Sequence, residues 1–125
     1  MTAIGAIRSI VLECGDPAPV AEFWSQVLDR PVVHREDDWW SLTPGQGGSR
    51  LAFQVVDGYE PPAWPGVHGE QQVHLDIEVD DLSAAAERVV ALGARRLSDV
   101  VDPGDEQWQV FADPAGHPFC LVLMT

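Results

Sequence analysis

The first half of the chain begins with alternating apolar and polar residues and continues with an apolar stripe at helical spacing. The alternation over residues 7–14 predicts a β-strand. Asp16 can cap a following helix whose first position is Pro17, where the missing N–H costs nothing, and Pro31 is expected to end this helix. The helical stripe consists of Val20, Phe23, Trp24, Val27 and Leu28. Three strands are then predicted, over residues 32–35, 39–43 and 50–56.

The second half of the chain repeats this order of elements. The two halves align when Ser9 is matched with His74, an offset of 65 residues, and Gln54 with Cys120, an offset of 66. Residues 57–69 lie between them, contain three prolines and three glycines, and are expected to form a loop. The second half is predicted to hold a strand over residues 71–79, a helix over 82–92 closed by Gly93, and strands over 95–99, 107–112 and 118–124.

This duplication predicts an α+β fold built from two tandem βαβββ modules. With 125 residues the chain is long enough for one domain with a core and too short for two independent ones. We therefore expect a single domain, residues 1–125, with the first module at about residues 5–57 and the second at about 70–124. The modules are expected to form a curved, barrel-like mixed sheet with the helices on its outer face.

The alternation within the strands predicts two unlike sheet faces. Apolar rows suited to lie beneath the helices are Ile10, Leu12 and Cys14; Leu51, Phe53 and Val55; Leu75, Ile77 and Val79; and Phe119, Leu121 and Leu123. The opposite rows are Ser9, Val11 and Glu13; Ala52, Gln54 and Val56; His74, Asp76 and Glu78; and Cys120, Val122 and Met124. Such a mixed face suits either solvent or a cavity wall, and the duplication favours a cavity between the half-sheets.

Composition narrows the classes of partner. Seven basic against twenty acidic residues give a net charge of −13, which repels phosphate backbones and anionic lipid surfaces, so neither nucleic acid nor a membrane is expected as a partner. No signal core or membrane span is evident, and a cytoplasmic location is expected. The only cysteines, Cys14 and Cys120, have no zinc-knuckle spacing and are expected to be reduced thiols.

Several residues on the mixed face are candidates for chemistry. His74 could act as a metal ligand or a general base, or be a hydrogen-bonded cavity histidine. Asp76 and Glu78 could polarise a substrate or accept from a cationic ligand, or belong to a solvated strand face. Trp40 and Trp108 hold similar places in the two halves and could stack a planar ligand, although ordinary packing would explain them as well.

Three segments of the chain resemble the vicinal oxygen chelate superfamily, which includes glyoxalases and bleomycin-resistance proteins. The first segment contains Phe23-Trp24 and Val27-Leu28-Asp29. The second contains Val73-His74-Leu75-Asp76, Val79-Asp80-Asp81-Leu82 and the helix end Leu92-Gly93-Ala94. The third is the run from Phe111 to Leu121, which contains Asp113-Pro114-Ala115-Gly116-His117. The likeness covers nearly the whole chain and is greatest to the uncharacterised glyoxalase-like branch.

The resemblance implies a cleft between paired modules, often across the interface of a homodimer, with metal ligands at four strand positions. These positions correspond to Ser9, Gln54, His74 and Cys120. A serine hydroxyl binds divalent metals poorly and an amide oxygen binds them weakly. We therefore expect a degenerate metal site in which His74, Gln54 and Cys120 would hold a divalent ion such as zinc, nickel, iron or manganese, if any ion binds.

Three functional hypotheses follow from the resemblance and the residues together. The first is binding of a small molecule in the cleft without an assigned activity. The second is a metal-dependent lyase, isomerase or dioxygenase with His74 and Glu78 as catalytic residues, and the third is sequestration of a cationic or aromatic compound, as in bleomycin-resistance proteins. The residues expected to contact a ligand are Glu13, Trp40, Gln54, Asp76, Trp108 and Cys120.

Overall fold

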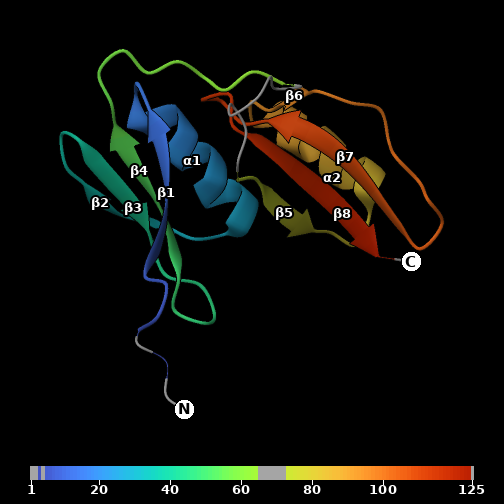
Figure 1. Ribbon diagram of the computed structural model, residues 1–125, viewed down its shortest axis with the longest axis horizontal. Helices are drawn as coiled ribbons and strands as arrows, with labels where there is room; N and C mark the ends of the chain where they lie inside the picture. Colours follow the sequence, from blue (N-terminus) through green and yellow to red (C-terminus); the bar gives the residue numbers. More distant parts are fainter. Residues whose placement is uncertain (1–2, 4, 65–72, 125) are drawn as a thin grey trace. The chain divides into compact units, whose positions relative to one another are not determined.

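The computed structural model describes residues 3, 5–64 and 73–124 and divides the chain into two compact units, Met1–Glu60 and Pro61–Thr125 (Figure 1). Each unit contains one helix and one four-stranded mixed sheet, in the order strand, helix and three strands. The α+β fold of two tandem βαβββ modules is therefore confirmed. In the described residues no helix has the length and apolar character that a membrane crossing requires.

The first unit consists of β1 (Ser9–Cys14), α1 (Pro17–Leu28), β2 (Val32–Arg35), β3 (Trp39–Leu42) and β4 (Arg50–Val55). Its sheet has the order β1-β4-β3-β2, with β1 parallel to β4 and the other neighbours antiparallel. The predicted strands agree with these bounds to within two residues. The parallel pair is possible because α1 serves as the crossover between β1 and the rest of the sheet.

The predicted stripe of α1 forms the core of the first unit. Val20, Phe23 and Trp24 are at most 2% exposed, and the rings of Phe23 and Trp24 meet edge to face with centroids 5.1 Å apart. Asp16 caps the helix by accepting a hydrogen bond from the N–H of Ala18 at 3.1 Å. The helix ends before Pro31, which corrects the expected stop: its last residue is Leu28, and Asp29 adopts the left-handed conformation with φ 52°.

The second unit consists of β5 (Leu75–Glu78), α2 (Leu82–Ala91), β6 (Arg95–Arg96), β7 (Glu106–Ala112) and β8 (Pro118–Met124). Its sheet has the order β5-β8-β7-β6, again with the first pair parallel. The core contains the stacked rings of Phe111 and Phe119, with centroids 5.6 Å apart and neither residue exposed. The helix α2 has 10 residues against 12 in α1, and it ends at Ala91, one residue before the predicted end.

Two predicted strands of the second unit are shorter in the structure. The strand expected over residues 71–79 begins at Leu75, and its predicted start at residue 71 lies outside the described residues. The strand expected over 95–99 stops at Arg96. Ser98 explains this early end. Its Oγ accepts a hydrogen bond from the N–H of Val110 at 3.0 Å, whereas in a continued strand a backbone carbonyl would accept it.

The strand register corrects the alignment of the two halves. Val11 lies opposite Ala52 in the first sheet, whereas Asp76 lies opposite Cys120 in the second. The helix caps Asp16 and Asp81 keep the 65-residue offset, which matches Val11 with Asp76. Cys120 therefore corresponds to Ala52, and matching it with Gln54 was wrong by two residues. Because side chains alternate along a strand, a shift of two leaves the predicted face unchanged.

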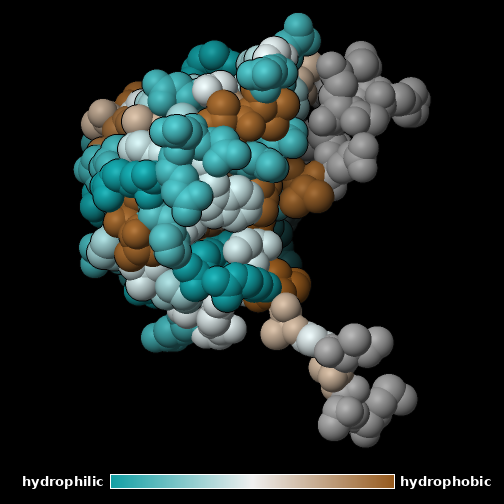
Figure 2. All heavy atoms as spheres, turned by 90° about the vertical axis from the view of Figure 1, so that its left-hand side faces the viewer, coloured by the Kyte–Doolittle hydropathy of each residue, from teal (hydrophilic) through white to brown (hydrophobic). Residues whose placement is uncertain are grey.

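Burial follows the predicted faces in most rows. Phe53, Phe119 and Leu121 are at most 1% exposed, as expected for positions beneath a helix. Ala52 was expected on the mixed face but is fully buried, and Ile10 was expected in the apolar row but is 36% exposed. On the face seen in Figure 2, apolar residues of the described chain form small separate groups among hydrophilic ones.

Candidate functional site

The start of the second sheet brings three side chains together: His74, Asp76 and Cys120, here called the three-donor cluster. Asp76 lies on β5 directly opposite Cys120 on the parallel strand β8. His74 precedes Asp76 by two residues, so both side chains leave the chain on the same side. One ligand atom from each of the three residues lies within 4.8 Å of the others. The two strands and their register thus assemble a compact set of donors.

Asp76 contacts the imidazole of His74. The distance from His74 Nε2 to Asp76 Oδ1 is 3.2 Å, and the two side chains are 44% and 62% exposed. Such an exposed contact contributes little to stability. When the histidine is neutral and Nε2–H donates to the carboxylate, the opposite ring nitrogen, Nδ1, keeps its lone pair. Asp76 can therefore select the tautomer and the orientation of His74.

Burial and Asp76 together favour the protonated form of Cys120. Burial raises the pKa of the Cys120 thiol to about 11, and the negative charge of Asp76 and its hydrogen bond to the thiol add to this effect. Near neutral pH the residue is a thiol and donates to the carboxylate, so it is not a ready nucleophile. A metal ion would have to displace the proton to gain a thiolate ligand, which makes binding by Cys120 stronger as the pH rises.

The donor set fits a divalent metal of borderline softness. Imidazole nitrogen, thiolate sulfur and carboxylate oxygen are all ligands of zinc, and three protein ligands with a free position are typical of reactive zinc sites. Among the described residues this is the one group of three or more histidine, cysteine, aspartate or glutamate side chains with converging donor atoms. The residues present therefore fit a metal ion of this class.

The other predicted ligand positions, Ser9 and Gln54, lie in the first unit. Gln54 is exposed on β4 and stands opposite Glu13, which is exposed on β1. Their counterparts by register in the second unit are Val122 and Glu78. Glu78 is exposed on the same side of β5 as Asp76 but does not belong to the converging group.

The two tryptophans proposed for stacking have different surroundings. The guanidinium carbon of Arg35 lies 5.2 Å from the ring centroid of Trp40, so a cation already covers one face of that ring. Trp108 is half-buried on β7, opposite Val122 on β8, and forms a bridge to Val101. Trp40 and Trp108 are thus parts of separate sheets, each with neighbours of its own.

Two further histidines have structural partners. His34 Nδ1 lies 2.6 Å from the hydroxyl of Ser41, which is 1% exposed, so the imidazole satisfies a buried polar group. His117 Nδ1 lies 2.7 Å from Asp113, whose carboxylate also accepts the backbone N–H groups of Ala115 and His117. This second network holds the turn between β7 and β8. His68 lies outside the described residues.

Sequence reasoning proposed Asp76 as a ligand contact but missed it as a member of the metal-capable group. The spacing of His74 and Asp76 on one strand face was a readable signal, because residues two apart on a strand point the same way. The approach of Asp76 to Cys120 had no such signal. It depends on the register of two strands that lie 44 residues apart in the sequence.

In each βαβββ unit the first strand along the chain is paired in parallel with the last. Two such units define the class of protein: paired modules of the vicinal oxygen chelate type. The chain belongs to the family of glyoxalase-like domains, whose model matches residues 9–122. A comparison with curated proteins gave no match.

Solved structures with the same fold come from several bacteria. A glyoxalase/bleomycin resistance protein/dioxygenase family enzyme from Burkholderia phytofirmans PsJN has a TM-score of 0.76 and 17% identity, with 97% of this chain and 100% of that chain covered. A glyoxalase-related enzyme from Fulvimarina pelagi has a TM-score of 0.73 and 21% identity, with 96% and 88% covered. At this identity the likeness establishes the fold alone.

Proposed function

We propose that this glyoxalase-like protein binds a small molecule through a divalent metal ion held by His74, Asp76 and Cys120. The observation that carries the proposal is the convergence of three different donor atoms within 4.8 Å on one side of the second sheet. Zinc and nickel suit this mixture of nitrogen, oxygen and sulfur better than iron or manganese, since the softer sulfur ligand favours the former pair. Ser9 and Gln54 are not needed for this set.

Each residue has a separate role in the proposal. When bound, the metal ion supplies a Lewis acid that polarises an oxygen of the small molecule. His74 offers a neutral nitrogen, and Asp76 offers one carboxylate oxygen while its Oδ1 orients the imidazole through the 3.2 Å contact with Nε2. Cys120 holds its proton until an ion competes for the sulfur, which limits binding at acidic pH. A lyase, isomerase or dioxygenase reaction would further require His74 or Glu78 at the reacting atoms.

Equilibrium dialysis against zinc, followed by elemental analysis, tests the metal proposal. We expect one ion per chain, with affinity reduced at least about tenfold in His74→Ala, Asp76→Asn and Cys120→Ser. Asp99→Asn removes an exposed carboxylate from the same unit and is the matched control, whose affinity should equal that of the wild type. Absence of stoichiometric zinc, or equal affinity in all variants, would contradict the proposal.

Sequestration of a cationic compound without metal is the second candidate. It is favoured by the exposed carboxylates of Asp76 and Glu78 on one side of β5 and by the net charge of −13. Titration with a planar aromatic cation such as ethidium, followed by tryptophan fluorescence, separates the two candidates. Binding that is lost in the double variant Asp76→Asn/Glu78→Gln and unaffected by a chelator would favour sequestration.

The expected homodimer belongs to the same proposal, because related folds often complete their cleft with a partner chain. Sedimentation velocity of the wild-type protein tests it directly. A species of twice the chain mass of 13.6 kDa is expected, and a monomer at all concentrations would contradict it.

A further inference from the structure

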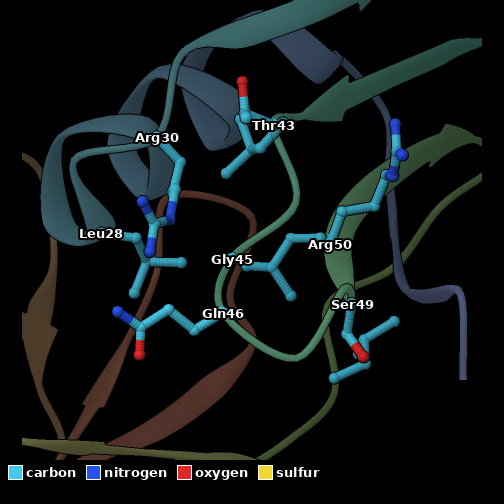
Figure 3. A pocket seen from close by; sticks show the side chains of 10 residues that line it. Leu28, Arg30, Thr43, Gly45, Gln46, Ser49 and Arg50 are labelled. Atoms are coloured by element: carbon cyan, nitrogen blue, oxygen red, sulfur yellow. The ribbon is translucent and has the colours of Figure 1, made fainter.

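The first unit contains a pocket that shares no residue with the three-donor cluster. It has a volume of about 320 Å³ and lies between the C-terminal end of α1 and the segment that joins β3 to β4 (Figure 3). This volume falls at the lower end of the range for small-molecule sites. The apolar part of its lining consists of Ile10, Leu28, Leu42 and Leu51, and the polar part includes Arg30, Gln46 and Arg50.

Arg30 and Gln46 form the polar side of the pocket. Figure 3 shows the guanidinium group of Arg30 and the amide of Gln46 on the same side, next to Leu28. Gly45 lies beside the guanidinium: a Cβ at that position would be 3.6 Å from both Nε and Nη2 of Arg30, an ordinary van der Waals distance. Several N–H donors therefore border an apolar wall. Arg50 points away from this pair in the same view and adds positive charge at a greater distance.

Neither arginine of the pocket is neutralised within the described part of the chain. The ion pairs there involve Arg35, His74 and His117, not Arg30 or Arg50. In addition, Nε of Arg50 is buried and has no hydrogen-bond partner among the described residues. The chain has twenty acidic residues and only seven arginines, so carboxylates are abundant and cations are scarce. Two unpaired arginines at one pocket are a local exception to the acidic surface.

We propose that this pocket binds a small organic carboxylate with a short apolar body. The guanidinium of Arg30 matches a carboxylate in a planar, two-point arrangement, and the amide of Gln46 can donate a further hydrogen bond. The leucines would cover the apolar body of the ligand. An inorganic phosphate would use the arginine but leave the apolar wall in water, so the lining favours the carboxylate.

An amide chemical-shift titration with hexanoate tests this inference on the full chain. We expect saturable shifts at Gln46 and its neighbours, no saturable shifts with hexan-1-ol, and weaker binding of phosphate. Arg30→Gln should weaken hexanoate binding about tenfold or more, which corresponds to the loss of one charge-assisted contact. Arg88→Gln removes the same charge from an exposed position on α2 and should bind hexanoate as the wild type does.

A second variant pair guards against a fold defect in Arg30→Gln. Gln46→Glu places a carboxylate beside Arg30 that competes with the ligand, whereas Gln26→Glu adds the same charge on the exposed side of α1. Only the first should weaken binding, with unchanged circular dichroism in both. Equal affinity in wild type, Arg30→Gln and Gln46→Glu would overturn the proposal, as would phosphate binding as tight as that of hexanoate.

Discussion

The two units of this protein have the same topology but different chemistry at matching strand positions. In the first unit the register pairs Val11 with Ala52, and in the second it pairs Asp76 with Cys120. Ser9 and His74 complete the comparison at the preceding position on the same side. One sheet therefore presents small or apolar groups where the other presents a carboxylate, a thiol and an imidazole. Repetition of the fold does not require repetition of the site, because backbone pairing determines the fold and individual side chains determine the site.

The largest expected effect tests whether the shared topology rests on equivalent core residues. The register makes Phe53 the counterpart of Leu121, and both are at most 1% exposed. Phe53→Ala should reduce the free energy of unfolding by about 3–5 kcal/mol and Leu121→Ala by about 2–5 kcal/mol. Urea denaturation followed by circular dichroism measures both. If either variant lost less than about 1 kcal/mol of unfolding free energy, the two residues would not be equivalent core positions.

The next effect concerns the thiol of Cys120, which has no donor counterpart in the first unit. Asp76→Asn should lower the pKa of Cys120 from about 11, although burial still keeps it raised, because the substitution removes the negative charge that disfavours the thiolate. The rate of alkylation by iodoacetamide, resolved by mass spectrometry from that of the buried Cys14, should rise several-fold at pH 8. Asp99→Asn is the control. An unchanged alkylation rate in Asp76→Asn would show that Asp76 does not raise the pKa of the Cys120 thiol.

The pH dependence of stability follows from the same raised pKa. The folded protein favours the protonated thiol, so this contribution to stability is fully present below the ordinary value of 9.0 and is lost as the pH rises towards about 11. Cys120→Ala should remove this alkaline decline. Urea midpoints measured between pH 8 and pH 11 in wild type and variant would show it, and parallel curves would contradict it.

The helix caps provide a smaller test, since here the units are alike. Asp16 accepts from Ala18 in the first unit, and Asp81 accepts from Ala84 in the second, at 3.1 and 3.0 Å. Replacement of either aspartate by alanine should cost about 0.5–2 kcal/mol of stability, measured by thermal or urea unfolding. Costs that differ by more than about 2 kcal/mol would show that the caps are not equivalent.

The smallest expected effect separates function from stability at the cluster. The contact of His74 with Asp76 is exposed, so His74→Ala should change the free energy of unfolding by less than about 1 kcal/mol. The same variant should lose most of its zinc affinity. A large loss of stability in metal-free buffer would instead assign His74 a structural role.

Much of the fold was predictable from local signals. The caps Asp16 and Asp81 mark the starts of both helices, and the apolar stripe with Phe23 and Trp24 determines the buried side of α1. The predicted ends of two elements were wrong because local contacts or backbone conformation ended the element earlier. Asp29 ended α1 before Pro31 by adopting a left-handed conformation, and the hydroxyl of Ser98 replaced a ladder carbonyl beside β7.

The site was predictable only in part. His74, Asp76 and Cys120 were each marked as candidates from strand alternation and the family resemblance, but their grouping depends on register. An alignment offset of 66 or 68 for β8 fits the sequence almost equally well, since both keep Cys120 on the mixed face. The pocket beside Arg30 gave no sequence signal, because its residues come from the end of α1 and the turn after it, the β3–β4 segment and the three strands β1, β3 and β4.

Cobalt(II) absorption can show directly whether the second unit supplies a thiolate, imidazole and carboxylate set that has no counterpart at the matching positions of the first unit. Thiolate ligation gives a sulfur-to-cobalt charge-transfer band in the near ultraviolet. We expect this band in the wild type and in Cys14→Ser, and its loss in Cys120→Ser. A wild-type protein without the band, or a Cys120→Ser variant that retains it, would contradict metal binding by the three-donor cluster.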